Sequence, residues 1–169
     1  MAKVMSIFDL LLFPLVLSIH NLEEGLFLPK WSQETKFVNV KRVGEVEFRF
    51  ALIIITLLAY LVSTIRVFNS ENHLSNLLYF GFLGTMILNA LIPHLSVSIM
   101  TKKYMPGLFS ALFINLPSLS FMTYKAYRLE FITLKELIMA TSVVSLLLLL
   151  LLPLLFKIGR SIEGFKDLK

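Results

Sequence analysis

The sequence predicts an all-α membrane protein, a polytopic bundle of about five transmembrane helices. Of the 169 residues, 57% are hydrophobic and only 16% are charged, and the mean hydropathy is +0.80. Only Arg66 and Glu71 are charged within residues 50–101, and no charge lies within residues 137–156. A soluble domain is about a quarter charged and cannot bury uncharged stretches of this length. The composition therefore excludes a cytosolic globular enzyme and a nucleic-acid-binding protein.

Five apolar stretches are long enough to cross the hydrocarbon core of a bilayer, which takes about 20 residues of helix. They cover residues 5–28, 47–68, 74–100, 107–127 and 133–156. The first stretch resembles a secretory signal, but Asp9 interrupts it and no Ala-x-Ala cleavage site follows, so we expect a retained helix. Residues 1–169 are expected to form a single membrane domain.

The distribution of Lys and Arg predicts the orientation. Five of the 16 lie on the side of the N-terminus and eleven on the opposite side. The positive-inside rule then places the C-terminus in the cytoplasm and the N-terminus outside, in a multi-pass protein of the cell membrane. The net charge of +5 has the same explanation, so we expect the lipid bilayer and no nucleic acid as a partner.

The longest predicted loop, residues 29–46, carries apolar side chains between Lys and Arg. Such a segment either lies on the anionic inner leaflet or is a solvated connector. Its apolar residues are Trp31, Phe37, Val38, Val40 and Val43.

The first span carries the pattern His20-x-x-Glu23-Glu24 at a depth where ionisable groups are costly and commonly functional. On a helix, Glu23 and Glu24 lie about 60° and about 40° to either side of His20. Both carboxylates can therefore reach the imidazole. Asp9 falls only about 20° from the same line, although an intervening proline loosens that alignment. The alternative, that the glutamates end the span as solvated carboxylates, is opposed by the apolar residues 25–28.

Polar residues of the later spans fall at the same predicted depth. His94 lies near the cytoplasmic end of the third span, where a lone histidine can also be an interfacial residue bonded to backbone. Asn89 is about 140° away from it on an ideal helix, so both face one site only if Pro93 distorts the helix. Tyr104 caps this side, and Asn115 lies about two turns back into the fourth span. The predicted site residues are His20, Glu23, Glu24, His94, Tyr104 and Asn115.

This pattern resembles the HXXEE-motif family of small integral membrane proteins. The resemblance rests on His20-x-x-Glu23-Glu24, then His94, then Tyr104-x-Pro106-Gly107, and covers about residues 20–117. In the family an asparagine commonly precedes the second histidine, and here Asn89 does so at a spacing one residue longer. The resemblance implies site positions rather than a reaction, because no activity is well established for the family.

Two histidines with one or two carboxylates are a ligand set suited to zinc, iron or manganese. The first hypothesis is a metal-dependent membrane enzyme acting on a lipophilic or membrane-adjacent substrate. In it His20, Glu24 and His94 bind a divalent metal and leave a position for water, and Glu23 is the general base. The second is a metal-free proton shuttle that isomerises or cyclises a lipophilic small molecule. The third is a non-enzymatic immunity or sensor protein.

Overall fold

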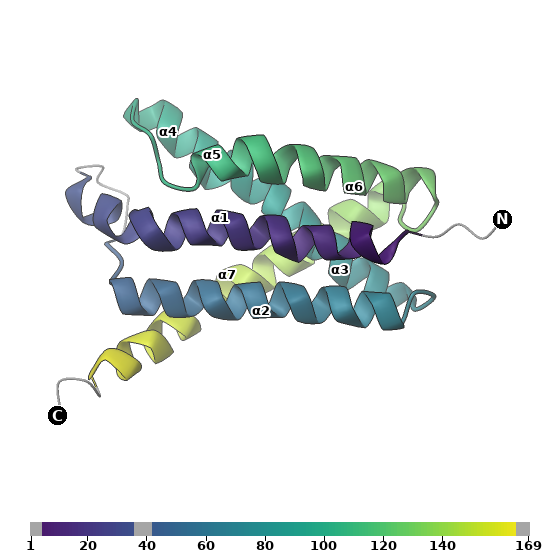
Figure 1. Cartoon of the computed structure of the whole chain (residues 1–169), viewed down its shortest axis with the longest axis horizontal. Coiled ribbons are helices and arrows are strands. Elements are labelled where there is room, and N and C mark those ends of the chain that lie inside the picture. The colour runs from purple at the N-terminus through teal and green to yellow at the C-terminus, as the bar shows by residue number, and fades with distance from the viewer. Residues whose placement is uncertain (1–4, 36–41, 165–169) are drawn as a thin grey trace.

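The computed structural model describes residues 5–35 and 42–164. All regular secondary structure in these two ranges is helical, which confirms the predicted all-α class. The elements are α1 (Ile7–Glu34), α2 (Glu45–Phe68), α3 (His73–Asn89), η1 (Ala90–Leu95), α4 (Ser96–Thr101), α5 (Leu108–Ser110), η2 (Ala111–Asn115), α6 (Leu116–Arg128) and α7 (Leu134–Gly164). They form five antiparallel passes, because α3–η1–α4 and α5–η2–α6 each make one, and α7 crosses the others obliquely (Figure 1).

Within the described ranges, four helices are long and apolar enough to cross a membrane, where the sequence predicted about five. These helices are Ile7–Glu34, Glu45–Phe68, His73–Thr101 and Leu134–Ile162. The predicted fourth span folds as α5–η2–α6 and is not among them. Its sequence is more polar, since Asn115, Ser118, Ser120 and Thr123 interrupt the apolar residues. The orientation of the bundle stays a prediction.

Helix α1 is longer than predicted, because it continues past residue 28 to Glu34. Residues 29–34 were expected in the first loop, but Pro29 is accommodated inside the helix. The Ser32 hydroxyl donates to the Pro29 carbonyl at 2.8 Å and accepts from the Val43 amide at 3.2 Å, which ties the helix end to the start of the next segment. Phe37, Val38 and Val40 of the predicted interfacial loop lie outside the described residues.

Asp9 takes no part in the predicted polar face around His20. It lies in the first turn of α1, where its carboxylate and the Ser6 side chain form a capping box. Its Oδ2 also accepts from Lys125 Nζ of α6 at 2.6 Å. Eleven residues of helix separate Asp9 from His20 by about 16 Å along the axis, too far for contact.

Close packing of α3 on α7 depends on glycine. A Cβ atom added at Gly81 would lie 2.7 Å from the Ala140 carbonyl oxygen of α7 and 2.9 Å from Val144 Cγ2. Small residues allow such approaches between membrane helices, where van der Waals packing drives association. The core beside this contact contains the fully buried ring of Tyr79, whose hydroxyl donates to the Leu10 carbonyl at 2.9 Å.

We expect Gly81→Val to push α7 away from α3 and to lower the free energy of unfolding by about 1–3 kcal/mol, the usual cost of overpacking. Thermal unfolding in detergent measures the effect. Leu149→Val is the matched control, because Leu149 is 64% exposed on α7. Equal stability of Gly81→Val and the wild type would show that α7 does not pack closely here.

Candidate functional site

A break in the third pass turns His94 into the bundle. Ile92 has φ −133° and ψ 112°, values outside the helical region, and a π-helical turn surrounds it. Pro93 follows and has no amide hydrogen to donate to a preceding carbonyl. Because the helix is distorted here, Asn89 and His94 face the same site. The sequence predicted this arrangement only for a helix that is distorted at Pro93.

His20, Glu24 and His94 form a compact group that we call the His–Glu cluster. His94 Nε2 lies 3.0 Å from Glu24 Oε1, and His20 Nε2 lies 3.8 Å from the same oxygen. The two imidazole rings meet edge to face, with centroids 4.8 Å apart. One candidate ligand atom from each residue lies within 4.8 Å of the others. Both histidines are buried and the Glu24 side chain is 12% exposed.

His94 is unusual because it is completely buried and neither ring nitrogen has a hydrogen-bond partner among the described residues. Its Nε2 is close to Glu24 Oε1, but the pair does not have hydrogen-bond geometry. Buried side-chain polar atoms in proteins are bonded in the large majority of cases. The His94 imidazole, paired with the Glu24 carboxylate and with no bonded partner for Nδ1, is therefore a candidate for binding a further group.

Glu23 points away from the His–Glu cluster. It forms hydrogen bonds that hold residues 104–110, which we call the 104–110 turn, against α1. Its Oε1 accepts from the Tyr104 hydroxyl and from the Gly107 amide, the latter at 2.9 Å. Its Oε2 accepts from Ser110 twice, from the amide at 3.0 Å and from the hydroxyl at 2.5 Å. The carboxylate thus takes up amide hydrogens at the start of α5, where a helix leaves donors free and favours negative charge.

Ser110 and Asn89 contact the two nitrogens of His20. The Ser110 hydroxyl lies 3.0 Å from His20 Nδ1. Asn89 Nδ2 lies 3.2 Å from His20 Nε2. Ser110 was not among the residues predicted from the sequence, since a serine in an apolar helix is common and usually packs helices together.

Gly107 allows the 104–110 turn to approach the His–Glu cluster. Its φ is +90°, a conformation that side chains other than glycine rarely adopt. A Cβ atom there would lie 2.5 Å from His94 Cε1 and 2.9 Å from Glu24 Cγ. Both the backbone conformation and the space require glycine at this position.

Tyr104 lies outside the membrane-spanning helices, and its pKa is raised above the ordinary value for tyrosine. Burial is the larger cause, and the hydrogen bond that its hydroxyl donates to the Glu23 carboxylate adds to it. The phenol therefore stays protonated at neutral pH and remains a donor. Its hydroxyl also accepts from the Phe109 amide at 3.2 Å, so Tyr104 is held within the 104–110 turn.

Five of the six predicted site residues come together in the structure: His20, Glu24 and His94 in the cluster, and Glu23 and Tyr104 beside it. Asn115 does not join them. It is buried in η2, its Oδ1 has no hydrogen-bond partner within the described ranges, and it makes no bond there to the cluster. The third histidine, His73, lies elsewhere and contacts Glu136 at 3.3 Å.

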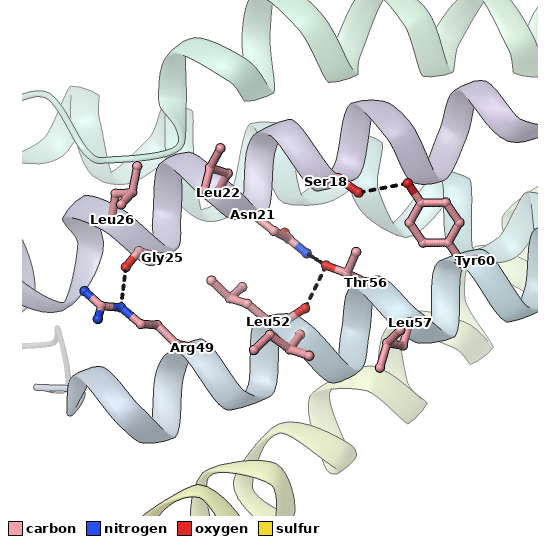
Figure 2. A pocket seen from close by; sticks show the side chains of 11 residues that line it. Ser18, Asn21, Leu22, Gly25, Leu26, Arg49, Leu52, Thr56, Leu57 and Tyr60 are labelled. Atoms are coloured by element: carbon pink, nitrogen blue, oxygen red, sulfur yellow. Dashed lines mark hydrogen bonds between the residues drawn. The ribbon is translucent and has the colours of Figure 1, made fainter.

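A separate groove of about 530 Å³ lies between α1 and α2 (Figure 2). Its polar side chains bond across the two helices: Asn21 donates to the Thr56 hydroxyl at 2.7 Å, and Arg49 donates to the Gly25 backbone carbonyl at 2.9 Å. Arg49 also pairs with Glu45 at 3.2 Å. None of the residues that line the groove belongs to the His–Glu cluster.

Comparisons with known proteins show the family of the chain. Residues 11–123 match the family described as "Protein of unknown function with HXXEE motif". The chain belongs to the HXXEE-motif family. A relative in Bacillus subtilis (strain 168), "Uncharacterized protein YrkK", is 41% identical over 151 residues, which cover 89% of this chain and 95% of the relative. No solved structure matches the chain. The family's name-giving residues are His20, Glu23 and Glu24, and the match also includes His94 and the 104–110 turn.

Proposed function

We propose that this HXXEE-motif protein holds one divalent metal ion, zinc, iron or manganese, at His20, Glu24 and His94. We propose further that it is a membrane enzyme acting on a lipophilic or membrane-adjacent substrate. The observation that carries the proposal is the grouping of one possible ligand atom each from His20, Glu24 and His94 within 4.8 Å of one another. In this group the completely buried His94 has Nε2 3.0 Å from Glu24 Oε1 and no bonded partner for Nδ1.

The donor set and its spacing fit a metal. Ligand atoms about 2.0–2.2 Å from a tetrahedral ion lie about 3.3–3.6 Å from one another. The two imidazole-to-carboxylate distances, 3.0 Å and 3.8 Å, fall on either side of this range. Two histidines and a carboxylate also match the three-ligand sets of catalytic zinc sites, which keep one position open.

A bound divalent ion in such a site supplies a water of lowered pKa or polarises a substrate oxygen. The residues of this chain would hold and orient the reactants. Asn89 reaches His20 Nε2 and is the amide nearest to the proposed site. The general-base role first considered for Glu23 has less support than a positioning role, because four donors already bond to its two oxygens.

A lipophilic substrate is favoured by the surroundings of the cluster. The residues that supply the three proposed ligands lie on two helices that are apolar enough to span a membrane. Large apolar side chains on the neighbouring segments are exposed, including Ile92 at 69% and Phe109 at 58%. In a multi-pass protein with the proposed orientation, N-terminus outside, these side chains meet lipid in the cytoplasmic half of the bilayer.

Metal titration of the purified, metal-free protein is the test. We expect one equivalent of Zn²⁺ or Mn²⁺ to bind and to raise the unfolding temperature, since a ligand at 100 times its Kd stabilises by about 2.7 kcal/mol. Chelation is expected to reverse the shift. If no divalent metal binds or stabilises the protein, the metal proposal fails, and the metal-free proton shuttle or a non-enzymatic role takes its place.

A further inference from the structure

The Ser110 hydroxyl has one hydrogen and several acceptors around it. Its oxygen lies 2.5 Å from Glu23 Oε2, 3.2 Å from the Gly107 carbonyl oxygen and 3.0 Å from His20 Nδ1. Hydrogen bonds to an ionised acceptor are shorter and about twice as strong as neutral ones. The hydrogen therefore goes to Glu23, which leaves the Ser110 oxygen free only to accept. The contact with His20 is then a bond that Nδ1–H donates.

The other side of the His20 ring requires the same arrangement. Asn89 Nδ2 carries hydrogens and approaches His20 Nε2 at 3.2 Å. Because an amide nitrogen cannot accept, this contact needs a lone pair on Nε2. The ring is buried, with 1% exposed, so solvent does not compete for either nitrogen. Two neighbours on two different helices thus select the tautomer with hydrogen on Nδ1.

We infer that Glu23 and Ser110 form a relay that fixes the tautomer and the rotation of His20 and keeps the lone pair on Nε2. In the metal-free protein this lone pair accepts from Asn89, and Asn89 would have to release it for Nε2 to bind the proposed metal. Metal-bound histidines commonly donate their other ring hydrogen to such an oxygen acceptor, and these outer partners raise metal affinity. The inference rests on the proposed function for its purpose, and the tautomer itself does not depend on a metal. Ser110 and Glu23 are positioning residues.

In this arrangement the two adjacent glutamates of the motif have different roles. Glu24 turns its Oε1 toward both imidazoles. Glu23, about 100° around the helix, faces the 104–110 turn, and its hydrogen-bonded connection to His20 passes through Ser110. A short side chain with one hydroxyl hydrogen is needed at position 110 because it must donate to Glu23 and accept from His20 at once.

Nitrogen NMR of the metal-free protein, with ¹⁵N in its histidines, tests the relay directly, because protonated and bare ring nitrogens give well-separated signals. His73→Ala and His94→Ala spectra assign His20. We expect hydrogen on Nδ1 in the wild type, a mixture of tautomers in Ser110→Ala and in Glu23→Gln, and recovery in Ser110→Thr. Zn²⁺ affinity is expected to fall about 10–100-fold in Ser110→Ala and to recover in Ser110→Thr.

Ser98→Ala is the matched control. It removes a hydroxyl that accepts from the Met105 amide at 3.1 Å in the same hairpin, and Ser98 does not contact His20. We expect its His20 signals and Zn²⁺ affinity to equal those of the wild type. Hydrogen on Nε2 of His20 in the wild type, or an unchanged tautomer in Ser110→Ala, overturns the relay. A wild type with the expected tautomer and no metal binding overturns only the proposed function.

Discussion

His94→Ala is expected to abolish stoichiometric metal binding while leaving the metal-free protein folded. Loss of one of three ligands should weaken Zn²⁺ by more than the roughly 10–100-fold that an outer partner contributes. The metal-free protein should remain folded at a lower unfolding temperature, because the substitution leaves a cavity and removes one imidazole from beside the Glu24 carboxylate. Calorimetric Zn²⁺ titration gives the affinity, and thermal unfolding with and without Zn²⁺ gives the coupling to stability.

His73→Ala is the matched control for this experiment. His73 is 64% exposed, and it lies at the first residue of α3 beside Glu136, away from the cluster. Its removal should leave both Zn²⁺ affinity and the Zn²⁺-induced rise in unfolding temperature unchanged. Equal Zn²⁺ affinity in His94→Ala and the wild type would exclude His94 as a ligand. Equal losses in His94→Ala and His73→Ala would indicate nonspecific binding to histidine.

Gly107→Ala is expected to damage both the turn and the cluster. A methyl group at φ +90° costs about 1–2 kcal/mol from backbone conformation alone. It would also lie 2.5 Å from His94 Cε1 and displace the imidazole. We therefore expect a lower unfolding temperature in the absence of metal and, in addition, a loss of Zn²⁺ affinity. Thermal unfolding and Zn²⁺ titration of the same preparations separate the two effects.

Gly25→Ala provides the comparison. A Cβ atom at Gly25 would meet Leu52 Cδ1 at 3.4 Å, an ordinary contact, and its backbone is helical. Alanine within a helix is favoured over glycine by about 0.5–1 kcal/mol, so this variant should be as stable as the wild type or slightly more stable. Wild-type stability and Zn²⁺ affinity in Gly107→Ala would contradict the described approach of the turn to His94.

The relative placement of His20 and Glu24 could be predicted from the sequence, because it depends only on the local geometry of α1. The spacing of His20 and Glu24 by one helical turn places both side chains on one face, whatever the rest of the chain does. The same rule placed both glutamates within reach of the His20 imidazole. In the structure Glu23 instead bonds to the 104–110 turn through tertiary contacts. Its partners in the 104–110 turn are more than 80 residues away, and nothing in its own helix indicates which of them it meets.

Long-range features were predictable only in outline. Depth in the membrane predicted that His94 and Tyr104 lie near the motif, because residues at one level of a bundle of crossing helices are brought close. The same reasoning placed Asn115 at this level, and within the described ranges it makes no hydrogen bond to the cluster, because depth does not fix which side chains bond to one another. The shared contribution of Asn89 and His94 depended on the break at Ile92, whose backbone angles a proline permits but does not specify.

The opposed directions of Glu23 and Glu24 have a consequence for how the bundle assembles. Both side chains leave the same turn of α1, one bonded to the start of α5 and the other facing His94, which follows the break at Ile92 in η1. A slip of α1 by one residue would rotate the helix by about 100° and withdraw both carboxylates at once. The two adjacent glutamates therefore fix the rotation of α1 about its own axis relative to η1 and the 104–110 turn.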